Sequence, residues 1–243
     1  MNAIQINNLT RRYGSLVAVD ALNLTIQQGE LFALLGVNGA GKTTTIKMLS
    51  CLSTPTSGDA ILLGNSIVSN PFAVKAKINV SPQETAIAPN LTVRENLELI
   101  AGIYCDAPKD VVRKTEAMLK RLGLEAVSRQ RAKTLSGGWQ RRLSIAMALI
   151  SDPQILFLDE PTLGLDVIAR RELWQVIQSL KGRMTIILTT HYLEEVEALA
   201  DRAGVMAAGK LKAVGTVEEL LALTGTKKFE DAFISLAVEG KVA

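Results

Sequence analysis

One short segment, Gly36 to Thr43, constrains the fold of this chain more than any other. It reads Gly-Val-Asn-Gly-Ala-Gly-Lys-Thr and matches the pattern G-x-x-x-x-G-K-[ST]. The apolar run Leu31–Leu35 precedes it, and a helical pattern begins at about Lys42. A strand before and a helix after are the context in which this pattern forms a phosphate-binding loop. The sequence therefore predicts an α/β fold that binds a nucleoside triphosphate.

The residues of this loop have different roles. Its glycines let the backbone curl so that successive N–H groups converge on the phosphates, and the helix N-terminus adds a partial positive charge. Lys42 is expected to reach the β- and γ-phosphates, and the Thr43 hydroxyl to hold magnesium. A glycine-rich turn that merely starts a helix is disfavoured by the flanking strand and helix. The predicted nucleotide-binding residues of the loop are Gly36, Val37, Asn38, Gly39, Ala40, Gly41, Lys42, Thr43 and Thr44.

Short apolar runs alternate with helical patterns along the rest of the chain, as in an α/β sheet protein. Between Thr92 and about Ser151 the pattern is nearly all helical, with Thr92 and Glu95 forming a capping box. A sheet domain interrupted by a helical insert is the simplest organisation. Strands are predicted at 4–9, 16–26, 31–35, 155–158, 185–190 and 204–207, a turn at 11–15, and helices at 166–181, from Thr216 and from about Lys228.

Polar groups follow two of the predicted strands. Asp159 and Glu160 end the run 155–158, where a carboxylate is costly unless a cation or a donor meets it. Asp159 is expected to meet the magnesium held by Thr43, and Glu160 to polarise a water aimed at the γ-phosphate. A strand-end carboxylate that only caps the next helix is the alternative. His191, the only histidine, follows 185–190, and this shared strand edge, where open α/β sheets bind ligands, favours a functional role.

Composition excludes several classes of protein. The formal net charge of +3 is too small to indicate a nucleic-acid reader. No run reaches the roughly 18 apolar residues of a membrane span, and Met1–Thr10 lacks the features of a signal peptide. Cys51 and Cys105 give neither a disulfide framework nor metal-ligand spacing. We therefore expect a soluble cytoplasmic protein.

The run Leu135-Ser136-Gly137-Gly138-Trp139-Gln140 closely resembles the signature motif of ATP-binding cassette (ABC) ATPases. A plain helix N-cap at Ser136 is the alternative reading of the same residues. The resemblance extends over nearly the whole chain. It implies that Tyr13 stacks on adenine, that Gln83 is the Q-loop glutamine that contacts magnesium, and that 161–166, ending in Asp166, is the D-loop. Val37 and Trp139 depart from the residues common in the family.

The resemblance implies one ABC ATPase domain over residues 1–243. Its fold is a P-loop NTPase (RecA-like) α/β core with an antiparallel β subdomain and an inserted α-helical signature subdomain. The core is expected in 1–90 and 152–215, the helical subdomain in 91–151 and a C-terminal helical tail in 216–243.

The resemblance also implies a mechanism with ATP as substrate and Mg²⁺ as cofactor. Two subunits close head to tail, and each ATP lies between one phosphate-binding loop and the partner's Ser136, Gly137 and Gly138. Glu160 acts as general base, and His191 and Lys42 stabilise the developing charge. The implied magnesium site is formed by Thr43, Gln83 and Asp159.

The stretch 188–197 and the tail 229–233 resemble bacterial exporter subunits. The expected function is to power export through a separate integral membrane permease, from the cytoplasmic face of the cell membrane, as a homodimer or heterodimer. No nucleic-acid partner is expected, and the basic residues near the signature are interpreted as a solvated or ATP-facing surface. A nontransport ABC ATPase acting on ribosomes or nucleic acid is the alternative. The basic residues are Arg129, Arg131, Lys133, Arg141 and Arg142.

Overall fold

A long antiparallel hairpin opens the chain. The computed structural model describes residues 1–239, and its first sheet has the strand order β2-β1-β4-β5. The predicted turn at 11–15 is wrong in part, because Arg11 pairs with Val19 and Tyr13 with Leu16. The turn narrows to Gly14 and Ser15, and Gly14 has a φ of 58° that suits a glycine. The strands are β1 (Asn2–Tyr13), β2 (Leu16–Gln27), β4 (Ser57–Leu62) and β5 (Asn65–Ser66).

The second sheet carries the strand ends that the sequence analysis singled out. Its order is β10-β9-β3-β8-β7-β6, parallel from β6 to β9, with β10 antiparallel at one edge. Every residue of β3, β7 and β8 is buried, and burial on both faces explains their uninterrupted apolar runs. The strands are β3 (Leu31–Gly36), β6 (Ile78–Ser81), β7 (Ile155–Asp159), β8 (Thr185–Thr190), β9 (Arg202–Ala207) and β10 (Lys210–Gly215).

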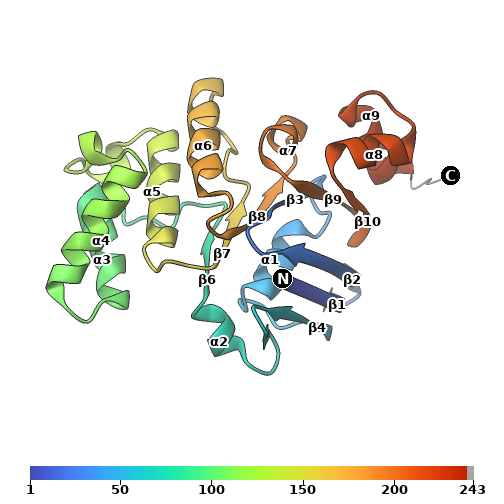
Figure 1. The fold of residues 1–243 in the computed structure, drawn as a ribbon, viewed down its shortest axis with the longest axis horizontal. Coiled ribbons are helices and arrows are strands. Elements are labelled where there is room, and N and C mark those ends of the chain that lie inside the picture. The colour runs from blue at the N-terminus through green and yellow to red at the C-terminus, as the bar shows by residue number, and fades with distance from the viewer. Residues whose placement is uncertain (240–243) are drawn as a thin grey trace.

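Alternate residues of the central strands enter different cores. Phe157 and Ile187 pack with Ile46 of α1 (Lys42–Leu49) and with the hairpin sheet, so α1 lies between the two sheets. Leu156 and Leu158 face the opposite side, where α6 (Val167–Leu180) covers the sheet. Figure 1 shows α6 and α7 (Leu193–Leu199) above the sheet and α1 below it. The loop that joins β3 to α1 therefore lies near the middle of the molecule.

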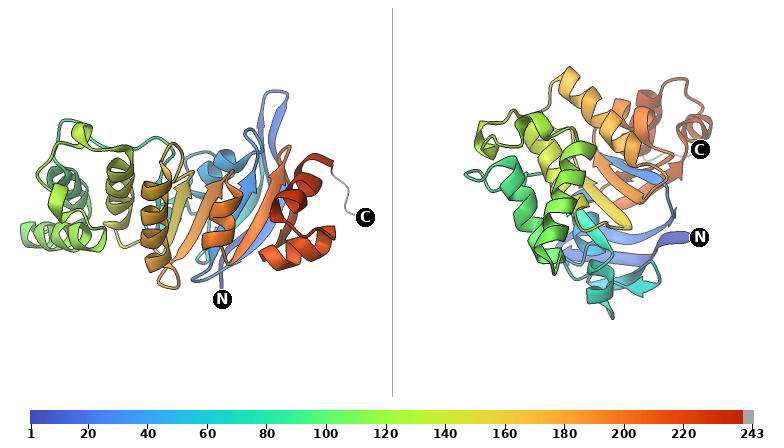
Figure 2. Two further views of the ribbon diagram at one scale, coloured as in Figure 1. Left: turned by 90° about the horizontal axis from the view of Figure 1, so that it is seen from above. Right: turned by 60° about the vertical axis from the view of Figure 1, so that its left-hand side comes forward.

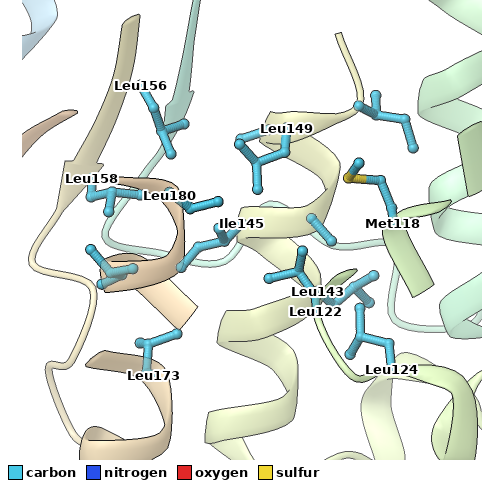
Figure 3. Packing of buried hydrophobic residues seen from close by; sticks show 14 of the residues in the cluster. Met118, Leu122, Leu124, Leu143, Ile145, Leu149, Leu156, Leu158, Leu173 and Leu180 are labelled. Carbon is cyan, nitrogen blue, oxygen red and sulfur yellow. The ribbon is translucent and has the colours of Figure 1, made fainter. Parts of the chain in front are cut away.

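A group of helices extends the molecule to one side, on the left of Figure 1 and of both views in Figure 2. It contains α3 (Val93–Tyr104), α4 (Pro108–Arg121) and α5 (Gly137–Leu149), and α2 (Pro71–Lys75) lies nearer the hairpin sheet. The predicted capping box of Thr92 and Glu95 is confirmed. Figure 3 shows the α5 residues Leu143 and Ile145 between Met118 of α4 and the strand residue Leu158. One core thus crosses the predicted subdomain boundaries at 91 and 151, which stay a prediction.

The C-terminal helices cover the other end of the sheet, on the right of Figure 1. They are α8 (Val217–Thr224) and α9 (Phe229–Ile234), followed by a π-helical turn at Ser235–Glu239. The helix predicted from Thr216 is confirmed, and Thr216 and Glu219 form a capping box at its start. Phe229 and Leu236 are buried against β3 and β9, with Phe233 packed beside them. Residues 240–243 of the predicted tail lie outside the described residues. No helix in the described part of the chain is both long and apolar enough to cross a membrane.

Candidate active site

The loop between β3 and α1 has a backbone that only glycine fits at two positions. Gly41, at the N-cap of α1, has a φ of 105°, and a Cβ built on it would lie 2.5 Å from the carbonyl oxygen of Ala18. A Cβ on Gly36 would lie 2.5 Å from the carbonyl oxygen of Met206. Both contacts involve backbone atoms that cannot move aside cheaply. The loop is therefore held tightly against β2 and β9 while its N–H groups stay at the start of a helix.

Lys42 lies beneath this loop. Its Nζ donates hydrogen bonds to the carbonyl oxygens of Gly36 at 2.7 Å and Val37 at 3.2 Å, and it lies 3.5 Å from Oε1 of Glu160. Burial lowers the pKa of Lys42, and the nearby Glu160 carboxylate opposes that shift. The first residue of α1 therefore places a cation beside the predicted general base.

Thr43 and Asp159 meet as the sequence predicts. The Thr43 hydroxyl donates to Oδ1 of Asp159 at 3.2 Å, and the Thr189 hydroxyl donates to the same oxygen. Asp159 is buried. A hydroxyl, one carboxylate and phosphate oxygens form the hard-oxygen donor set that Mg²⁺ takes in nucleotide sites. Among residues 1–239 no three His, Cys, Asp or Glu side chains gather as a metal-binding group, so the donors fit Mg²⁺ held partly by a phosphate better than a metal caged by protein.

Glu160 is fixed by its backbone and by both of its carboxylate oxygens. It has a φ of 46°, in the left-handed region that is costly for a residue with a side chain. Its N–H donates to the carbonyl oxygen of Thr189 at 3.1 Å and to the Thr189 hydroxyl at 3.0 Å. Oε2 lies 3.1 Å from Nδ1 of His191, and Oε1 faces Lys42. The carboxylate is thus aimed between two groups that can carry positive charge.

Lys42, Thr43, Glu160 and His191 line one cavity of about 710 Å³. The predicted site residues Gly36, Val37 and Asp159 are not part of its lining. Tyr13, half exposed, stands at its rim with the Arg11 guanidinium 4.6 Å from the centre of its ring. One face of Tyr13 is therefore occupied, and the other can stack on a base. The predicted site residues lining the cavity are Tyr13, Asn38, Gly39, Ala40, Gly41, Lys42, Thr43, Thr44, Gln83, Glu160 and His191.

The signature residues and Asp166 lie elsewhere on the described chain. Ser136 precedes α5, but its hydroxyl makes no capping bond, so the plain N-cap reading has no support among the described contacts. Ser136 and Gly137 are exposed, and a Cβ on Gly138 would lie 3.0 Å from Cβ of Ala169, so glycine lets α5 approach α6 closely. The Asp166 carboxylate caps α6 through the N–H groups of Ile168 and Ala169.

The basic surface predicted around the signature is wrong for Arg141, which is buried with 4% of its surface exposed. Arg142 lies 4.9 Å from the Trp139 ring centre and 2.6 Å from Glu172 of α6. Trp139 itself is partly buried against the core of the helical group. The described contacts of Trp139 therefore support a role in packing. Sequence reasoning missed Thr189, the buried contacts of Arg141 and the N-cap of Asp166, and only the last carries a sequence signal, an aspartate directly before a helix.

The fold and the site define a P-loop NTPase. The ABC transporter family profile matches residues 19–163. Daunorubicin resistance ATP-binding protein DrrA3 of Streptomyces coeruleorubidus is 39% identical over 94% of this chain and 72% of its own. The probable multidrug ABC transporter ATP-binding protein YbhF of Escherichia coli (strain K12) is 38% identical over 96% of this chain and 41% of its own. This chain therefore belongs to the ABC transporter family, as an ATP-binding, ATP-hydrolysing cassette.

Solved structures agree with this assignment. The ATP-binding subunit of an ABC transporter superposes with a TM-score of 0.84 at 26% identity, covering 96% of this chain and 99% of its own. A dimeric cassette in a post-hydrolysis state, bound to ADP and Pi, superposes with a TM-score of 0.78 at 25% identity, covering 88% of this chain and 98% of its own. The predicted family and P-loop fold class are confirmed, while the roles of individual site residues stay predictions.

Proposed function

We propose that this chain is the ATPase subunit of an exporter and closes as a dimer around two Mg²⁺-bound ATP molecules to drive a separate membrane permease. The observation that carries this proposal is the divided site. Lys42, Glu160 and His191 share one cavity, whereas Ser136 and Gly137 lie exposed at the start of α5, outside that cavity. A helix N-terminus is a natural donor to a γ-phosphate, and a second subunit would bring it there.

The surface beside the signature supports a protein contact. Val167 and Ile168, on the first turn of α6, are 63% and 72% exposed, and Leu163 in the D-loop is 41% exposed. Apolar side chains grouped on one surface commonly mark an interface. Because Leu163 also lines the cavity, closure of a second subunit would bury these side chains next to the nucleotide. A homodimer or a heterodimer satisfies this geometry.

Each residue of the cavity has a defined part in hydrolysis. Glu160 accepts a proton from the attacking water, and His191, 3.1 Å from its Oε2, orients it and donates toward the γ-phosphate. Lys42 neutralises charge on the phosphates, and Tyr13 stacks on the base. Thr43, Asp159 and Gln83 would hold Mg²⁺, which when bound neutralises charge on the β- and γ-phosphates. Asp166 is still predicted to contact the nucleotide across the dimer, in addition to its observed role as the N-cap of α6.

A groove on the helical group supports docking of a permease helix. A hollow of about 180 Å³ lies between the end of β6, the Q-loop and helices α3 and α5. Ile103 and Tyr104 line it while 70% and 53% of their surface is exposed. An apolar stripe of a partner helix fits such a groove. Docking there would place the subunit at the cytoplasmic face of the membrane, with Gln83 close to the contact.

The relatives favour export over the nontransport alternative. Their names are those of a daunorubicin resistance protein, a probable multidrug transporter subunit and a Nod factor export protein, the last 40% identical over 90% of this chain. The chain spans 72% of the length of the first and 41% of the second. We extend the export role to this chain as a proposal, and no observation on its described residues favours ribosomes or nucleic acid.

The variant Glu160→Gln tests the mechanism. ATP binding should persist, because Lys42 and the loop are intact, while hydrolysis falls about 10²–10⁴-fold with loss of the base. Light scattering should then detect an ATP-held dimer. The exposed Glu125, in the helical group, gives the control Glu125→Gln, which should behave as wild type. A Glu160→Gln protein that stays monomeric with ATP, both with and without magnesium, would contradict the dimer, and full hydrolysis would contradict the base.

The partner is tested in native membranes. The tagged full chain should co-purify in stoichiometric amount with a polytopic membrane protein, and substitution of Ile103 by Asp in the groove should abolish that capture while leaving ATP binding intact. Ribosomal proteins or DNA recovered in place of a membrane protein would overturn the transporter proposal and leave the ATPase chemistry in force.

A further inference from the structure

Arg141 makes an unusual set of contacts on α5. Its side chain is buried, and each of its five N–H groups points at a main-chain carbonyl oxygen. Nε donates to the carbonyl oxygen of Pro161 at 2.7 Å. Nη1 donates to the carbonyl oxygen of Pro82 and, at 3.2 Å, to that of Gln83. Nη2 donates to the carbonyl oxygens of Asp159 and Glu160, both at 2.7 Å. The fixed fork of a guanidinium can serve this many acceptors at once, whereas the single nitrogen of a lysine cannot.

Among residues 1–239 no carboxylate lies at ion-pair distance from Arg141, although the Asp159, Glu195 and Glu160 carboxylates act on its charge from farther away. Burial lowers the pKa of Arg141 to about 10, which still leaves the group charged near neutral pH. A buried charge whose direct hydrogen-bond partners are all carbonyl groups is a poor source of stability, because a well-packed apolar side chain of similar volume is often as good or better. What the guanidinium supplies that an apolar side chain cannot is a fixed position for several carbonyl groups.

The carbonyl groups belong to two segments that matter for hydrolysis. Pro82 and Gln83 begin the Q-loop, next to the proposed permease groove. The other segment runs from Asp159 through Glu160, the proposed base. Because Glu160 has the costly φ of 46°, its conformation persists only where neighbours fix both of its peptide groups. Thr189 holds the N–H side, and Arg141 holds the carbonyl side.

We propose that Arg141 is a positioning residue that aims the Glu160 carboxylate at the attacking water and makes that aim depend on the Q-loop and on the signature helix. The proposal rests on the proposed function, in which Glu160 is the base. Displacement of α5 or of Gln83 shifts the shared guanidinium and with it the Glu160 peptide. A misplacement of about 1 Å at a reacting group can cost about 10²-fold in rate.

The alternative is that Arg141 only stabilises the fold. The kinetics of variants separates this structural role from the proposed positioning role. Arg141 does not line the nucleotide cavity, so Arg141→Met should leave the Kd for ATP within about twofold of wild type while kcat falls about 10²-fold, the cost of a misplaced reacting group. Arg141→Lys keeps the charge and one point donor, and should recover only part of kcat. Thermal melting of both variants checks that the folded fraction is the same.

The neighbouring Arg142 supplies a matched control. It lies on the same helix but contacts Trp139 and Glu172, away from the cavity. Arg142→Met should lower stability and leave kcat of the folded protein near wild type. If Arg142→Met lowers kcat as much as Arg141→Met does, general loosening of α5 explains the result and the proposal is overturned.

The double variant Arg141→Met/Glu160→Gln gives the decisive measurement. If Arg141 acts through Glu160, the double variant hydrolyses ATP no more slowly than Glu160→Gln alone, because the misaimed base is already gone. Independent, multiplying effects overturn the proposal, as does a folded Arg141→Met protein with the kcat of wild type. Unchanged hydrolysis by Glu160→Gln alone would instead refute the proposed function, so the two failures are distinguishable.

Discussion

The buried carboxyl group of Glu195 permits a quantitative test of the electrostatics beneath the active site. Glu195, on α7, is completely buried, and its Oε1 accepts a hydrogen bond from Nε1 of Trp174 at 3.2 Å. Within residues 1–239, Oε2 has no hydrogen-bond partner, and neither has the buried hydroxyl of the nearby Thr162. Burial raises the pKa of Glu195 above its ordinary value, and the opposing influence of its hydrogen bond from Trp174 is smaller.

The substitution Glu195→Gln should stabilise the protein. The amide keeps the acceptor for Trp174 and adds a donor within reach of Thr162. A buried polar group without a partner costs about 1–3 kcal/mol, so we expect a gain of about that size. For a chain of this length 1 kcal/mol corresponds to about 2–4 °C in Tm, which gives a rise of about 2–12 °C.

The gain should depend on pH in a defined direction. Because the folded-state pKa of Glu195 is raised, the folded protein binds more protons than the unfolded chain above the ordinary pKa of a glutamate. The stability of the wild type therefore falls as pH rises from that ordinary value through the raised one. The advantage of Glu195→Gln should be smallest at mildly acidic pH and larger at mildly alkaline pH.

Thermal unfolding without nucleotide at these two pH values measures the effect. Glu194 is the matched control, since its side chain is 76% exposed and meets only Arg170 at 3.6 Å. Glu194→Gln should change stability by less than about 0.5 kcal/mol, as surface substitutions do. If Glu195→Gln melts below the wild type at both pH values, or with a difference that does not change with pH, then the carboxylate is the favoured buried form and the reasoning is refuted.

Two further substitutions test the nucleotide site directly. His191→Ala should lower kcat about 10²–10³-fold, the usual cost of one transition-state donor, while calorimetry finds ATP affinity retained. Turnover that survives this change removes His191 from the mechanism. Gly41→Ala should abolish nucleotide binding, because its φ of 105° and the Ala18 carbonyl oxygen at 2.5 Å leave no room for a methyl group. A Gly41→Ala protein that still binds a fluorescent ATP analogue would contradict the loop geometry.

Three of the predicted strands are buried on both faces. β3, β7 and β8 appear as continuous apolar runs because both faces are covered. β4 and β10 were not predicted, because Ser57–Leu62 and Lys210–Gly215 are only partly buried and neither forms a continuous apolar run. The same reason applies to Arg11–Tyr13, where polar residues continue a strand through pairing with β2.

The candidate site likewise contains residues that the sequence predicts and contacts that it could not predict. Thr43, Asp159, Glu160 and His191 were predicted to converge because each stands just beyond a strand or at the loop after one, and parallel strands end at one edge. The contacts of Arg141 could not be predicted, because all of its partners are main-chain carbonyl groups. Carbonyl groups are the same in every residue, so no residue type marks them.

The two ends of the signature helix explain why such a residue belongs there. Ser136 and Gly137 stand exposed at the start of α5, while Arg141, little more than one turn later, is buried against the Glu160 peptide. A helix moves as a rigid body over so short a distance. In the proposed dimer, a contact that draws the exposed end toward the partner's phosphate would therefore also move the guanidinium that holds the peptide of Glu160, the proposed base, in its own subunit. Under that proposal, the geometry of one helix links dimer closure at one nucleotide site to the position of the catalytic base at the other.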